Sequence, residues 1–137
     1  MKTLTTRRRS PLEFAHRWTE AWNNGDLDAV LEHFDNDVAF SSPKALEAVG
    51  VPTVLGKTAL RRYWAAALQP VKSLRFTLLR VIWDPDGSEL AIIYDRNVNG
   101  RHDRASEVLH FGPSGRVIRG EVFYGVVSQP RTDLVPG

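Results

Sequence analysis

The chain has 137 residues, a formal net charge of +2 and no cysteine. This length fits a single domain with its own core, and the lack of cysteine excludes disulfides, thiol nucleophiles and thiolate metal sites. Beyond the run Arg7-Arg8-Arg9, basic residues are interleaved with acids, so we expect no nucleic-acid partner.

Residues 1–9 are expected to form a flexible basic arm. Thr6-Arg7-Arg8-Arg9 is faintly similar to a twin-arginine export segment, but charges interrupt the apolar stretch that should follow. No segment approaches the roughly 20 apolar residues that cross a bilayer. We therefore expect no signal peptide, no membrane association and a cytoplasmic location.

Helices are predicted in the first half of the chain. Ser10 and Glu13 can form a capping box, and apolar residues recur behind it at helical spacing, which predicts a first helix over residues 11–24. A second, shorter helix follows, with an apolar stripe that ends at Phe34. Another helical stripe predicts a third helix over residues 57–69.

The connection between the second and third helices has two expected parts. Residues 38–42 form a short strand closed by Pro43. Residues 43–56 contain two prolines and two glycines among small apolar residues, which predicts an irregular segment. This segment is a candidate lid over a ligand.

From Ser73 onward the apolar period changes to two, which predicts strands joined by turns containing Gly or Pro. Asn99-Gly100 is a strong hairpin signal. The expected antiparallel strands are 73–83, 89–98, 101–111 and 116–126, followed by a loose tail at 128–137. Helices before a sheet predict an α+β fold, in which three N-terminal helices pack on one face of an antiparallel sheet.

Glu107 is a carboxylate on the apolar face of the last hairpin. With a two-residue tip at Pro113 and Ser114, Glu107 lies opposite Gly120. An acid facing a glycine among apolar side chains predicts a concave site with one functional carboxyl; those neighbours are Leu109, Ile118, Val122 and Tyr124.

The opposite face of the same hairpin mixes apolar and charged residues. Val108, Val117 and Phe123 are its expected apolar members. Such a face suits a modest homodimer interface, although scattered surface apolar residues are the simpler alternative.

The sequence resembles the nuclear transport factor 2-like superfamily, in its SnoaL-like and ketosteroid isomerase-like branch. Each motif is weak alone, but four occur in the family's order. They are Arg17-Trp-Thr-Glu-Ala-Trp-Asn-Asn-Gly-Asp-Leu-Asp28, Phe34-Asp-Asn-Asp-Val-Ala-Phe40, Gly56-Lys-Thr-Ala-Leu-Arg-Arg-Tyr63 and the hairpin from Glu107 to Gly125. The resemblance implies one cone-shaped α+β domain over residues 10–127, with three N-terminal helices packed on the concave face of a curved antiparallel sheet.

The resemblance also implies roles for three residues. Glu107 falls at the position of the isomerases' protonated acid, Trp18 at their tyrosine donor, and Ser42 where their base carboxylate stands. An indole still donates a hydrogen bond, but a serine hydroxyl is too weak to remove a carbon-bound proton. The standard isomerase mechanism is therefore disfavoured.

Two other enzyme types share this fold. Epoxide hydrolases use an Arg with two Asp; Asp95 and Arg96 lie in the right strand, but the last strand has no second Asp. Cyclases of the polyketide type need mainly one acid in an apolar cavity, a role that Glu107 fits. Its pKa is expected to rise in such a cavity.

Simpler interpretations stand beside these roles. Glu107 can be a buried acid that only pairs with a neighbour, and Arg96 with Asp103 can form a cross-strand ion pair on the surface. The four histidines are dispersed, and no nucleotide motif is present. We expect no metal and no cofactor.

The sequence thus predicts a domain that binds a small hydrophobic molecule, with Glu107 as its candidate catalytic acid. The activity expected is that of an isomerase or cyclase on a carbonyl compound; a ligand carrier or sensor and a protein-interaction module are the alternatives. The predicted ligand-binding residues are Trp18, Phe40, Ser42, Tyr63, Gly120, Val122 and Tyr124.

Overall fold

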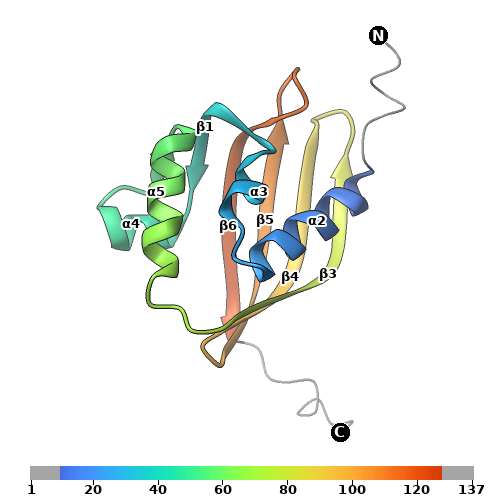
Figure 1. Ribbon diagram of the computed structural model, residues 1–137. Helices are drawn as coiled ribbons and strands as arrows, with labels where there is room; N and C mark the ends of the chain where they lie inside the picture. The colour runs from blue at the N-terminus through green and yellow to red at the C-terminus, as the bar shows by residue number, and fades with distance from the viewer. Residues whose placement is uncertain (1–9, 128–137) are drawn as a thin grey trace, which may run out of the picture.

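The computed structural model describes residues 10–127, so the predictions for the arm at 1–9 and the tail at 128–137 lie outside the described residues. Four helices accompany one sheet in this region (Figure 1). The helices are α2 (Pro11–Asn23), α3 (Leu27–Leu31), α4 (Pro43–Val49) and α5 (Lys57–Leu68). The strands are β1 (Phe34–Ser41), β2 (Thr53–Leu55), β3 (Leu74–Asp84), β4 (Glu89–Val98), β5 (Arg101–Phe111) and β6 (Val117–Val127).

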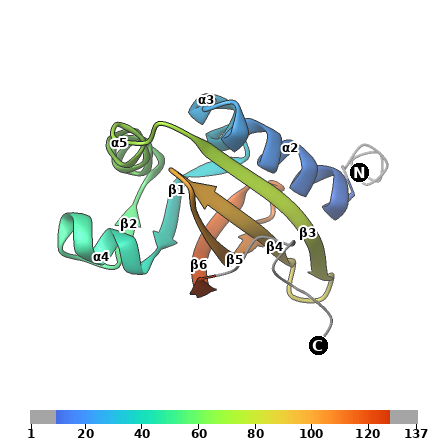
Figure 2. The same ribbon diagram turned by 90° about the horizontal axis from the view of Figure 1, so that it is seen from below.

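The sheet has the strand order β2-β1-β6-β5-β4-β3. All neighbours are antiparallel except β1 and β6, which run parallel. The sheet is curled but not closed, and α2, α3 and α5 lie along its concave side (Figure 2). The predicted α+β class is confirmed, with α4 as an additional helix. No helix within residues 10–127 is long and apolar enough to span a membrane.

Helix α2 is fixed at both ends by side chains. Its predicted capping box is present, since the Ser10 hydroxyl accepts from the Glu13 backbone and Glu13 accepts from the Ser10 backbone. At the other end, Asn23 Nδ2 donates to the Phe76 carbonyl at 3.0 Å, and the Phe76 amide donates to Asn23 Oδ1 at 2.7 Å. These bonds set the position of α2 on β3.

The segment between α3 and α5 differs from the expectation. Strand β1 already begins at Phe34, so this residue does not extend the helical stripe. Residues 43–56 are not irregular, because they form α4 and β2. Pro43 occupies the first turn of α4 and Gly50 ends it at φ 83°, so these residues are helix boundary signals and not chain breakers.

The register of the last hairpin was predicted wrongly by two residues. Glu107 lies opposite Val122, and Gly120 lies opposite Leu109. One residue of the shift comes from the turn, where Gly112 pairs with Arg116 around three residues and Gly115 adopts φ 85°. The other comes from a bulge, because His110 pairs with Arg119 but Phe111 pairs with Val117.

The bulge also changes the placement of Val117 and Ile118. Ile118 was expected beside Glu107 on the apolar face but is the unpaired extra residue of the bulge. Val117 was expected on the outer face but is fully buried in the core, because the extra residue before Arg119 reverses the alternation there. Beyond the bulge the total shift is even, so Val122 and Tyr124 remain on the Glu107 face as predicted.

Candidate functional site

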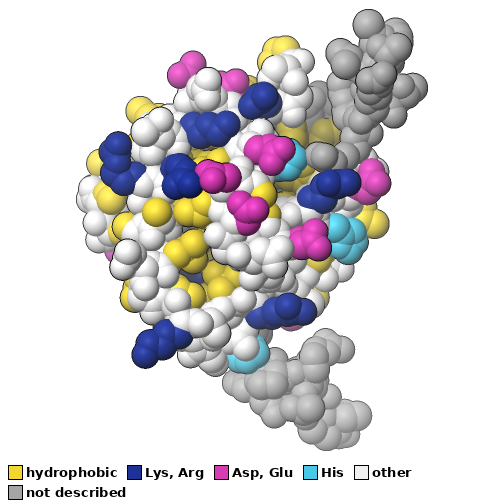
Figure 3. Space-filling view, in the orientation of Figure 1, with side chains coloured by type: hydrophobic (Ala, Val, Ile, Leu, Met, Phe, Trp, Pro, Cys, Tyr) yellow, Lys and Arg dark blue, Asp and Glu magenta, His cyan; other side chains and the backbone are white. Residues whose placement is uncertain are grey.

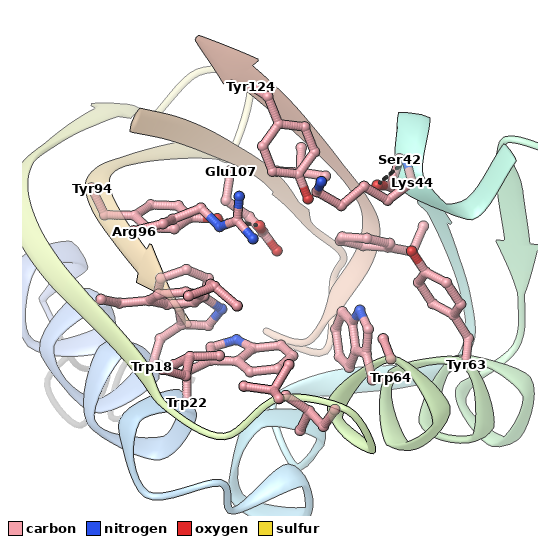
Figure 4. A pocket seen from close by; sticks show the side chains of 18 residues that line it. Trp18, Trp22, Ser42, Lys44, Tyr63, Trp64, Tyr94, Arg96, Glu107 and Tyr124 are labelled. Atoms are coloured by element: carbon pink, nitrogen blue, oxygen red, sulfur yellow. Dashed lines mark hydrogen bonds between the residues drawn. The ribbon is translucent and has the colours of Figure 1, made fainter. Parts of the chain in front are cut away.

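A cavity of about 260 Å³ lies between the sheet and helices α2 and α5 (Figure 4). Its size is slightly below the range of about 300–1,000 Å³ that is usual for small-molecule sites. Lys44 and Ala67 are exposed members of the lining and mark the edge that meets solvent. The lining consists of Trp18, Trp22, Phe40, Ser42, Lys44, Tyr63, Trp64, Ala67, Leu68, Val71, Leu74, Phe76, Tyr94, Arg96, Val98, Glu107, Val122 and Tyr124.

The structure brings the predicted site residues together, with one exception. Glu107 and six of the seven predicted ligand-binding residues line the cavity. Gly120 does not. It pairs with Phe40, and a Cβ at Gly120 would lie 2.9 Å from Phe40 Cδ1, so this glycine allows Phe40 to pack directly onto the sheet.

Glu107 is the buried acid of the cavity, with 4% of its surface exposed. Burial raises the pKa of its carboxyl from the ordinary 4.5 to about 8, although Tyr94 and Arg96 both oppose the rise. The Tyr94 hydroxyl donates to Glu107 Oε1 at 3.4 Å. At neutral pH the carboxyl is therefore mostly protonated, and its own O–H is a hydrogen-bond donor.

Two indole groups add further donors. Trp18 and Trp22 point from α2 into the cavity (Figure 4). Their Nε1 atoms are buried and have no hydrogen-bond partner among residues 10–127. A buried N–H without a partner is costly, and an acceptor atom of a ligand would remove that cost.

The Trp18 and Trp22 rings belong to a wider aromatic floor. Trp22 contacts Trp64 with ring centroids 5.0 Å apart, and Trp64 contacts Phe40 at 5.1 Å. Trp18 contacts Tyr94 at 5.0 Å. Seen from outside, apolar side chains gather between α5 and α2, with charges of both signs around them (Figure 3).

Ser42 has a structural task. Its hydroxyl caps α4 by accepting from the Lys44 amide at 3.1 Å, and its side chain is buried. It also interacts with the Tyr63 and Tyr124 hydroxyls. Burial raises the pKa of Tyr124 to about 12, so this phenol stays neutral.

Arg96 and Asp103 are cross-strand partners, as predicted, but the pair is not on the surface. Nη1 of Arg96 donates to both carboxylate oxygens at 3.0 Å, and the two side chains are 14% and 13% exposed. Asp95 points to the outer face, where Arg104 donates to it at 2.9 Å. An Arg–Asp water site of the epoxide hydrolase type is therefore not assembled in the cavity.

Sequence reasoning did not assign Lys44, Tyr94 and Arg96 to the site. Tyr94 and Arg96 alternate with Ile92 on one face of β4, and that period could have placed them beside Glu107. Lys44 had no such signal, because its segment was expected to be irregular. Among residues 10–127, no three His, Cys, Asp or Glu side chains form a group able to hold a metal ion.

Family comparison identifies the chain. The SnoaL-like domain model matches residues 15–122, most of the chain, so the protein belongs to the SnoaL-like domain family. A SnoaL-like protein of unknown function from Burkholderia thailandensis is similar in sequence and structure, with 32% identity and a TM-score of 0.75. The match covers 85% of this chain and 94% of that one. Comparison with curated proteins gives no match.

More distant structures share the fold alone. A protein from Kribbella flavida provisionally assigned as a ketosteroid isomerase has 16% identity and a TM-score of 0.67, over 93% of this chain and 83% of that one. A protein from Sinorhizobium meliloti provisionally assigned as a polyketide cyclase has 18% identity and a TM-score of 0.66. That match covers 84% of this chain and 100% of that one.

Proposed function

We propose that the cavity binds a small, largely apolar carbonyl compound and that Glu107 acts on it as a general acid in an isomerisation or cyclisation. The observation that carries this proposal is a buried carboxyl, with a pKa that burial raises to about 8, at a cavity where two indole N–H groups lack hydrogen-bond partners among residues 10–127. These donors suit a carbonyl oxygen, which only accepts.

The proton can be supplied and recovered by the same residue. Glu107 donates its proton to the carbonyl oxygen of the ligand, which gives a protonated carbonyl with acidified α-protons and leaves a carboxylate. That carboxylate then removes an α-proton from carbon, which gives the enol and returns Glu107 to its starting protonated state. The Ser42 hydroxyl takes no part as a base, because it caps α4 and a hydroxyl is too weak for the task.

A ligand carrier is the second candidate, and the same Ser42 observation favours it. With a serine at position 42 in place of a base carboxylate, the cavity has what it needs to hold a ligand and less than the isomerases use to transform one. An interaction module predicts a filled space beside Glu107, whereas Glu107 lines a cavity of about 260 Å³.

The test uses 2-tetralone, a compact bicyclic ketone, in deuterated buffer. We expect the wild-type protein to accelerate exchange of the ketone's α-protons, measured by NMR, and Glu107→Gln to lose at least about 100-fold of this acceleration. The amide keeps the shape and a donor, so affinity measured by calorimetry should change by only a few fold. Glu121→Gln, an exposed acid on the neighbouring strand, is the matched control.

Three other outcomes are decisive. Full exchange activity in Glu107→Gln would remove Glu107 from the acid role. Binding of 2-tetralone without accelerated exchange in the wild-type protein would favour the carrier. Absence of any binding would contradict the proposed ligand class.

A further inference from the structure

Two cations share one aromatic ring at the side of the cavity. Lys44 Nζ lies 4.7 Å from the ring centroid of Tyr124, and Arg96 Cζ lies 4.9 Å from the same centroid. Lys44 comes from α4 and Arg96 from β4, and both line the cavity. Figure 4 shows both side chains directed toward Tyr124, with Arg96 also beside Glu107.

The charges of these two cations are not equally compensated. Arg96 is paired with Asp103 through Nη1. Its Nη2 donates no hydrogen bond to another residue within 10–127. Lys44 has no carboxylate within 4.0 Å in the same part of the chain, and this includes Glu47 one turn along α4. The positive charge of Lys44 is therefore not paired with a carboxylate in this part of the chain.

The other titratable groups in the cavity do not cancel this charge near neutral pH. Burial keeps Glu107 mostly protonated, and the pKa values of Tyr63, Tyr94 and Tyr124 are raised, so all three phenols are neutral. The solvent edge of the cavity thus carries one positive charge that has no carboxylate partner within residues 10–127, next to aromatic walls. A purely apolar ligand leaves that charge unused, whereas an anionic group gains a charge-assisted hydrogen bond.

We propose that the ligand is a flat ring compound that carries an ionised acidic oxygen, a carboxylate or an acidic enol, held by Lys44 beside Tyr124. Its rings lie against the tryptophans, and its anionic oxygen accepts from Lys44 Nζ and from the free side of Arg96. This inference rests on the proposed function, because it names the substrate class of the same cavity.

Matched pairs of probes test the charge with the shape held constant. For the carboxylate the pair is 2-naphthoate and 2-naphthamide; for the enol it is 2-hydroxy-1,4-naphthoquinone and 1,4-naphthoquinone. Calorimetry at pH 7 and low salt should show at least one anion binding about tenfold more tightly than its neutral partner. The preference should shrink as salt is added.

Variants then assign the preference to Lys44. Lys44→Met keeps the length of the side chain without the charge and should abolish the preference by weakening the anion alone. Lys57→Met is the control, because Lys57 does not line the cavity. Lys44 is exposed, so its replacement should not disturb folding, which circular dichroism checks.

The outcomes separate the two proposals. A preference in only one pair identifies the carboxylate or the enol as the acidic group. Equal affinities within both pairs, or a preference that survives Lys44→Met, would overturn the anionic anchor while 2-tetralone exchange could still support the acid role of Glu107. Failure of all four probes to bind would overturn the inference, and the ketone experiment would then judge the proposed function separately.

Discussion

Glu107 makes the stability of the fold depend on pH. The folded protein holds this proton up to about pH 8, whereas the unfolded chain releases it near the ordinary value of 4.5. The contribution of Glu107 to stability is therefore fully present below about pH 4.5, falls as pH rises, and levels out above about pH 8. The slope from this one group is at most about 1.4 kcal/mol per pH unit.

Replacement of the acid should remove that dependence. We expect Glu107→Gln to be more stable than the wild-type protein, by a margin that grows from pH 5 to pH 8 and then stays constant. Urea unfolding at several pH values measures the margin. Glu121→Gln should follow the wild-type profile because Glu121 is exposed, and a constant margin for Glu107→Gln would show that Glu107 titrates normally.

The sequence predicted several of the residues that meet in the cavity, but it did not predict that Arg96 lies mostly buried beside them. Alternation along the hairpin placed Glu107 on the apolar side, and motif positions brought Trp18 and Ser42 to the same cavity. Arg96 was assigned to a surface pair, since cross-strand pairing gives partners but not depth. Burial depends on how far the sheet curls and on what α2 covers, and neither is encoded within the hairpin.

The packing of β6 against Phe40 requires a glycine at position 120. Phe40 occupies the space that a side chain at Gly120 would need, with Leu109 Cδ2 at 3.2 Å on another side. We expect Gly120→Ala to destabilise the fold by about 1–3 kcal/mol. Thermal unfolding measures the loss.

A second substitution tests the cause. Phe40→Leu in the Gly120→Ala background should recover part of the stability, because the smaller side chain yields the space, although Phe40→Leu alone should be destabilising. Simple additivity of the two losses would mean that Phe40 is not what the new methyl group meets.

Local sequence signals predicted the helices and the long strands, but they did not predict the register between β5 and β6. Capping residues and the Asn99-Gly100 turn act over a few neighbours, and their elements formed where predicted. Strand β6 pairs with β1 on one side and with β5 on the other, and its register includes the bulge after Val117. A register that depends on three strands cannot be read from the local sequence of one hairpin. Residues 43–56 were misjudged because Pro43 and Gly50 serve equally as helix boundaries and as breakers.

The whole molecule presents an outer sheet face with large apolar side chains. Ile82 and Phe123 are 55% and 50% exposed. Ile93 is in register with Phe123 through Ser106, whereas Ile82 pairs with Ala91. A homodimer through this face stays a prediction. Sedimentation should show a dimer at micromolar concentration, and Phe123→Asp should yield a monomer because dimerisation would bury the new charge.

Leu55→Asp provides the control for the dimer. Leu55 is 71% exposed but lies on β2 at the far edge of the sheet, so this variant should remain dimeric. A monomeric wild-type protein, or a Phe123→Asp variant that sediments as a dimer, would contradict the use of the outer face.

The unpartnered indoles also affect competition with solvent. The indole N–H groups of Trp18 and Trp22 are donors without partners among residues 10–127, and the protonated Glu107 carboxyl adds an O–H donor. A water molecule that accepts from these donors must still place its own two hydrogens, and the indoles pack against the rings of Tyr94 and Trp64. A ketone oxygen brings no hydrogens, so it gains the same bonds without stranding any. The excess of hydrogen-bond donors thereby favours a ketone oxygen over water in the cavity. The size of the cavity alone cannot provide this discrimination.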